Sequence, residues 1–117
     1  MEFIRRRAMR YYFGGPAEVT DVGSKIQLLA STTDLSAFGC FVKTTNPFPQ
    51  GTRIALKITH SGLVFATSGQ VTHAQPNKGM GIAFGAVEPD DQVVLNRWLA
   101  HGERRRRFIP AHFNSAT

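Results

Sequence analysis

Apolar and polar residues alternate in the middle of the chain. Ile54, Leu56 and Ile58 are separated by single residues, and the charged residues Arg53 and Lys57 occupy positions of the opposite parity. A period of two is typical of a β-strand with one face in the core and the other in water. We therefore expect a strand over residues 53–59.

A second strand follows almost at once. Ser61-Gly62 is a turn signal, and the segment Leu63–His73 is again strand-like, so the two segments predict a hairpin. Gly69 within the second strand predicts a β-bulge or a bend at a barrel corner. Further short segments are bounded by Gly, Pro or Asn: Ala17–Val22, Lys25–Ser31, Phe38–Thr44 and Met80–Gly85. Short strands at this regular spacing predict a mainly β fold, a small antiparallel barrel.

One helix is expected near the C-terminal end, over residues 89 to about 101. Pro89 suits the first helical position, and Asp90 and Asp91 put negative charge at the positive end of the helix dipole. His101-Gly102 is expected to end the helix. Four apolar residues then share one face, which predicts a lid on one opening of the barrel: Val94, Leu95, Trp98 and Leu99.

The charge of the chain is concentrated at its ends. The 117 residues fit one domain, and 14 Lys and Arg against 8 Asp and Glu give a net charge of +6. Such a balance suits nucleic acid, a nucleotide or an anionic membrane surface equally. Ten of the 14 cations are arginines, and eight of the 14 lie in residues 5–10 and 104–107. The body between them is nearly neutral, which argues against a uniformly basic DNA-coating surface.

The sequence offers little support for catalysis or metal binding. Cys40 lies alone in an apolar stretch, which predicts an inert buried thiol, and the four histidines have no spacing typical of a zinc site. Gly79-Met80-Gly81 lies in an expected strand and lacks the spacing of a dinucleotide fingerprint. We expect no enzymatic activity, no metal and no cofactor. The sequence also has no signal peptide pattern and no apolar run near the roughly 20 residues that span a bilayer, so we expect a cytoplasmic protein.

Two short motifs carry the most specific information. Arg6 and Arg10 form Arg-x-x-x-Arg, and Asp34, Ser36 and Gly39 form Asp-x-Ser-x-x-Gly. Each motif alone has an ordinary interpretation, a solvated charged face or a turn. In this order, on a chain of short strands, they resemble the PilZ domain family. Segments that resemble its later elements are Gly69-Gln70-Val71, Gly79–Phe84 and the helix with Trp98.

The resemblance implies a six-stranded antiparallel barrel with a C-terminal helix that binds cyclic di-GMP, a bacterial second messenger. Arg6 and Arg10 would grip phosphates and guanines, because a guanidinium can fork onto either group. Asp34 and Ser36 would read a guanine, and Gly39 would allow a close backbone approach or a positive φ. Other residues of these segments are assigned to the core: Phe38, Cys40, Ile82 and Phe84.

Arg5 and Arg7 are secondary candidates for ligand binding. With Arg5 the segment also resembles the Arg-Arg-x-x-x-Arg variant, which in the family goes with two stacked ligand molecules. We expect residues 1–13 to form a flexible arginine segment that reorders on binding, 14–103 the barrel with its helix, and 104–117 a basic tail. We expect Arg104–Arg107 to be a solvated charged run. The alternative is that it contacts an acidic partner protein or the ligand of a neighbouring chain.

The expected function is that of a single-domain receptor and adaptor that signals to a partner protein. Two other functions stay open from the sequence. One is a protein–protein interaction module of the same fold that does not bind the ligand, and the other is a nonspecific nucleic-acid binder. Motility, exopolysaccharide and virulence pathways are all compatible with the family.

Overall fold

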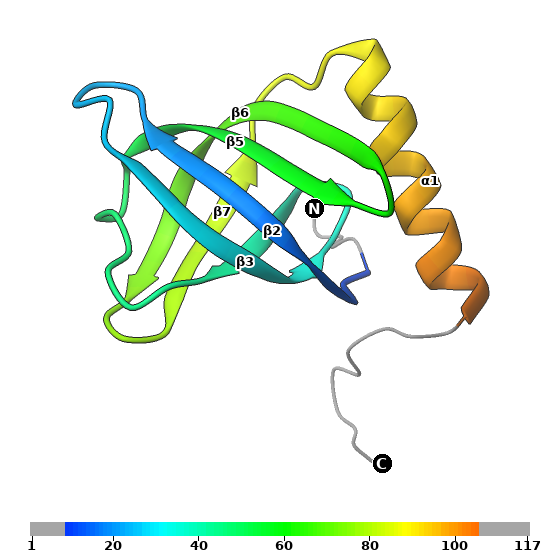
Figure 1. The fold of residues 1–117 in the computed structure, drawn as a ribbon, viewed down its shortest axis with the longest axis horizontal. Helices are drawn as coiled ribbons and strands as arrows, with labels where there is room; N and C mark the ends of the chain where they lie inside the picture. Colours follow the sequence, from blue (N-terminus) through cyan, green and yellow to red (C-terminus); the bar gives the residue numbers. More distant parts are fainter. Residues whose placement is uncertain (1–8, 106–117) are drawn as a thin grey trace, which may run out of the picture.

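Six strands form a closed antiparallel barrel in the computed structural model, which describes residues 9–105 (Figure 1). The order around the barrel is β2-β3-β4-β7-β6-β5. The strands are β2 (Tyr11–Asp21), β3 (Gln27–Leu35), β4 (Gly39–Lys43), β5 (Arg53–His60), β6 (Leu63–Gln75) and β7 (Gly79–Phe84). The expected six-stranded barrel with a C-terminal helix is confirmed.

Alternation along the strands fills the barrel interior. In β5, Ile54, Leu56 and Ile58 are at most 2% exposed, whereas the residues between them face water. The hairpin expected at Ser61-Gly62 joins β5 to β6, and Ser61 has a positive φ of 52° there. Inward-facing side chains of the other strands complete the core, among them Val19, Val42, Phe65, Val71 and Ile82.

Three register shifts interrupt the ladders: between Tyr12 and Gly15, between Thr32 and Asp34, and between Val71 and His73. Of the two features expected at Gly69, a bulge or a bend at a barrel corner, the bulge lies instead at Thr72, three residues further along β6. Gly69 pairs with both Ile54 and Phe84, so it lies where β6 passes from β5 to β7. A Cβ at Gly69 would lie 2.5 Å from the Ala83 carbonyl oxygen, so the glycine serves a close backbone approach.

Helix α1 (Pro89–Arg105) lies across one end of the barrel (Figure 1). Leu95 and Trp98 join the core at 0% and 6% exposure, and Val94 and Leu99 pack against it, as expected. The helix begins at Pro89, and Asp91 accepts a hydrogen bond of 2.9 Å from the Ala66 N–H of β6. No helix in the described residues is both long and apolar enough to cross a bilayer.

Some expected boundaries differ from the observed ones. Tyr11–Phe13 belong to β2, although we assigned them to the arginine segment, because Tyr11 and Tyr12 pair with the end of β3 and Phe13 packs against the core. Helix α1 continues past His101-Gly102 to Arg105. The Tyr11 ring packs against the bare backbone of Gly102, where a Cβ would lie 3.0 Å from Tyr11 Cγ. Most of the expected arginine segment, residues 1–8, and of the basic tail, residues 106–117, lies outside the described residues.

Candidate ligand-binding site

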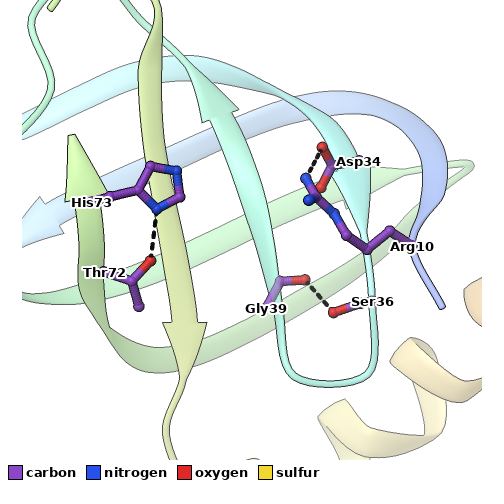
Figure 2. Close-up of polar contacts among 6 residues, drawn as sticks. All are labelled: Arg10, Asp34, Ser36, Gly39, Thr72 and His73. Atoms are coloured by element: carbon purple, nitrogen blue, oxygen red, sulfur yellow. Dashed lines mark hydrogen bonds and ion pairs between the residues drawn. The ribbon is translucent and has the colours of Figure 1, made fainter. Parts of the chain in front are cut away.

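An ion pair joins the two motifs singled out in the sequence. Arg10, just before β2, donates from Nη2 to Oδ2 of Asp34 in β3 over 2.6 Å (Figure 2). The Arg10 side chain is 57% exposed and that of Asp34 only 9%. A guanidinium has five N–H donors in a planar fork. One hydrogen bond to Asp34 therefore orients the fork and leaves donors for an anion or a guanine edge.

The bulge in β3 explains where Asp34 points. Thr32 pairs with Val42 and Leu35 with Cys40, and all four residues are buried. A regular strand cannot turn residues 32 and 35 to the same face, because side chains alternate. The register shift supplies the extra residue, so Asp34 faces outward beside Leu35, which belongs to the core.

Ser36 and Gly39 shape the connection between β3 and β4. The Ser36 hydroxyl accepts a hydrogen bond from the Phe38 N–H at 3.2 Å and lies 3.3 Å from the Gly39 carbonyl oxygen, to which it donates (Figure 2). A Cβ at Gly39 would clash with the Ile82 carbonyl oxygen of β7. Gly39 thus serves close packing of two strands, and no positive φ occurs at it. This part of the second motif is also a structural turn.

Phe38 corrects one expectation. We assigned it to the core, but it is 69% exposed and lines the surface depression beside the motifs. It lies in the connection before β4, where the chain turns and strand alternation no longer decides which way a side chain faces. Cys40 and Ile82 are buried as expected, and Phe84 is half-buried against Phe65, with ring centroids 5.1 Å apart.

A single cross-strand row extends the site beyond the motifs. Asp34 pairs with Phe41 of β4, Phe41 with Gly81 of β7, and Gly81 with His73 of β6. A depression of about 250 Å³ follows this row, and its lining comprises Arg10, Asp34, Ser36, Phe38, Gly39, Cys40, Phe41, Thr72, His73, Gly81, Ile82 and Ala83. The outer face of four neighbouring strands therefore forms one continuous shallow surface.

Sequence reasoning missed the β6 side of this surface. We assigned His73 no role in ligand binding, and it lies within β6 next to Thr72, where both residues are exposed. Gly79 and Gly81 were the available signal, since alternate glycines in a strand often receive rings from neighbouring strands. Which rings they receive depends on the register of β6 against β7, and that register includes a bulge.

Cys40 lies beneath the surface and is chemically quiet. Burial, and to a lesser degree the negative charge of Asp34, raises the pKa of its thiol far above the ordinary value. The thiol therefore stays protonated at neutral pH, and a protonated thiol is a poor nucleophile. Among the described residues, no cluster of three His, Cys, Asp or Glu side chains could hold a metal ion.

Three of the expected ligand residues, Arg5, Arg6 and Arg7, lie outside the described residues. Of the expected set, the structure brings together Arg10, Asp34, Ser36 and Gly39. The family is decided by comparison of the whole chain. A family model described as the PilZ domain matches residues 4–101.

The chain belongs to the PilZ domain family.

Solved structures share the PilZ fold with this chain at low sequence identity. Bacillus subtilis Inhibitor of motility (MotI/DgrA) has a TM-score of 0.71 and 17% identity, over 92% of this chain and 55% of that one. The PilZ domain with c-di-GMP of YcgR from Escherichia coli has a TM-score of 0.68 and 21% identity, over 89% of this chain and 95% of that one. The PilZ domain of CeSA from a cellulose-synthesizing bacterium has a TM-score of 0.64 and 21% identity, over 80% of this chain and 97% of that one. The chain thus spans about half the length of MotI, and a comparison with curated proteins gives no match.

This PilZ domain also has a larger cavity, of about 830 Å³, that contains neither motif. It lies between the start of β2, the β5–β6 turn and α1, and aromatic residues line much of it, including Tyr11, Phe13, His60 and Trp98. His60 Nδ1 lies 2.8 Å from the Gly14 carbonyl oxygen, and its ring packs on Phe13. The Arg10–Asp34 pair and the outward-facing polar groups belong to the smaller depression and not to this cavity.

Proposed function

We propose that this protein binds cyclic di-GMP on the outer surface of the barrel, at the depression that contains Arg10 and Asp34. The observation that carries the proposal is their ion pair of 2.6 Å, since it unites two motifs 24 residues apart at one exposed site. The PilZ family match and the ligand named for the YcgR domain support the same chemistry.

The residue types suit the ligand. Cyclic di-GMP carries two phosphates and two guanines, and each guanine edge offers O6 and N7 as acceptors. The free donors of Arg10 match either group, and the proposal gives Arg6, with Arg5 and Arg7 in secondary roles, the same task. Asp34 acts mainly as the positioning residue for Arg10, because most of its surface is already covered. Ser36 and Gly39 hold the adjoining backbone.

We further propose that the protein is a non-enzymatic adaptor. In this proposal, ligand binding reorders the arginine segment, and the new surface is read by a partner protein. The name of MotI, an inhibitor of motility, supports a role of this kind for a related fold. A receptor of a second messenger has to meet it inside the cell, so the proposed location is the cytoplasm.

Calorimetric titration of cyclic di-GMP tests the site. We expect Arg10→Ala, and likewise Arg6→Ala, to weaken binding about 100-fold, since each guanidinium is expected to make one or two charged hydrogen bonds of roughly 1.5–3 kcal/mol each. Arg10→Lys keeps the charge and loses the fork, so it should recover only a small part of the affinity.

Lys57→Ala is the matched control, because it also removes one exposed cation but from β5, outside the depression. Its affinity should equal that of the wild type. If Lys57→Ala and Arg10→Ala weakened the binding of cyclic di-GMP equally, the loss would come from the reduced net charge, and the site assignment would be wrong. No binding by the wild type would favour the interaction module, and binding of duplex DNA that falls steeply with salt would favour the nucleic-acid binder.

A further inference from the structure

His73 stands at the end of the cross-strand row, opposite Asp34. The register shift between Val71 and His73 leaves Val71 in the core and turns both Thr72 and His73 to the outside. Thr72 Oγ1 lies 3.2 Å from His73 Nδ1 (Figure 2). The Phe41 ring centroid is 6.0 Å from that of His73. The exposed imidazole thus has a hydroxyl on one side and an aromatic ring beside it.

The glycines of β7 complete the seat for this ring. A Cβ at Gly81 would clash with His73 Cε1 and lie 2.6 Å from Nδ1, so the imidazole rests against bare backbone. A Cβ at Gly79 would likewise lie 2.7 Å from Cε2 of Phe41. The two rings therefore occupy the space of missing side chains, and the imidazole presents one edge away from Thr72 (Figure 2).

The row is long enough for two bases. From Asp34 on β3 to His73 on β6 it crosses three strand spacings, about 14 Å in all at roughly 4.8 Å each. Arg10 supplies donors at the β3 end, and the imidazole lies at the β6 end. A ligand with two identical bases, one at each end, needs a recognition group at both.

We propose that His73 is a specificity-determining residue that donates from Nε2–H to O6 of the second guanine; this inference rests on the proposed function. The proposal assigns the imidazole the tautomer in which the Thr72 hydroxyl donates to Nδ1 and the proton is on Nε2. Guanine and adenine both offer N7 as an acceptor, but guanine adds O6, whereas adenine has an amino donor at that position. An N–H donor directed at O6 therefore favours guanine and rejects adenine.

The test compares cyclic di-GMP with cyclic di-AMP in calorimetric titrations of the full chain. His73→Phe keeps a ring of similar shape and removes the donor. We expect this variant to weaken binding of cyclic di-GMP about 10-fold. The ratio of the affinity for cyclic di-GMP to that for cyclic di-AMP should fall by a similar factor. Thr72→Val removes the hydroxyl to which the proposal gives the role of donor to Nδ1, and we expect a smaller change, about threefold, in the same direction.

His101→Phe is the control, because it makes the same substitution on α1, outside the row. This variant should leave the ratio of the two affinities unchanged. A His73→Phe variant with the wild-type ratio would overturn the role of His73 while leaving the proposed function intact. A wild type that binds neither ligand would overturn the proposed function itself, and this inference with it.

Discussion

Arg10 and Asp34 depend on each other unequally. The guanidinium is largely solvated, whereas nine-tenths of the Asp34 side chain is covered. An exposed ion pair adds little to stability, at most about 1 kcal/mol, but a covered acceptor that loses its partner keeps a desolvation cost of about 1–3 kcal/mol. The folded state therefore tolerates an unpaired Arg10 better than an unpaired Asp34.

Arg10→Ala should consequently lower the free energy of unfolding by about 1 kcal/mol, the low end of that range, because loss of the long side chain also admits water to Asp34. Asp34→Asn should cost less, since its amide oxygen still accepts a hydrogen bond. Urea denaturation of both single variants and of the double variant measures the difference. The double variant should be more stable than Arg10→Ala alone, and a double variant as unstable as the sum of the singles would contradict the argument.

Residue types predicted the motif side of the candidate site, and they did not point to the β6 side of the depression. Arg10 and Asp34 could be paired in advance because a known family links their motifs. Phe38 was misassigned and His73 was given no role, for a common reason. Each lies where strand alternation is interrupted, Phe38 at a turn and His73 at a bulge, so the two-residue period does not show which residues of neighbouring strands they lie beside.

At the scale of elements, α1 is held by one face. Leu95 is fully buried and Trp98 nearly so, whereas Val93, two residues before Leu95, is 60% exposed. The apolar spacing predicted this face correctly. It could not predict the C-terminal end, because Gly102 is a usual helix stop and its contact here is with Tyr11 from the other end of the chain.

Leu95→Ala should lower the free energy of unfolding by about 3 kcal/mol, since it leaves a cavity where helix and barrel meet. Val93→Ala, on the exposed side of the same helix, should change it by less than about 0.5 kcal/mol. Thermal or urea denaturation of both variants compares them directly. Similar losses in the two would mean that the helix is stabilised by its own propensity and not by packing on the barrel.

The whole molecule should report ligand binding through its stability. A ligand that binds only the folded state at 100 times its Kd adds about 2.7 kcal/mol to the free energy of unfolding. For a domain of this size that corresponds to a rise in Tm of about 10 °C. Thermal denaturation with and without cyclic di-GMP measures the shift, and at the same concentration Arg10→Ala should show almost none. A full shift in Arg10→Ala would remove Arg10 from the binding surface.

Closure of the barrel limits how another protein can recognise this one. Each of the six strands is hydrogen-bonded to a neighbour on both sides, so the unpaired strand edges of the described domain are short. Residues 27–30 of β3 have no partner on β4, and residues 11–16 of β2 have none on β5. An extended peptide or a second copy therefore finds little backbone to pair with. We expect whatever reads the ligand-bound state to read mainly side chains, so its footprint should be open to mapping by substitution of single surface residues.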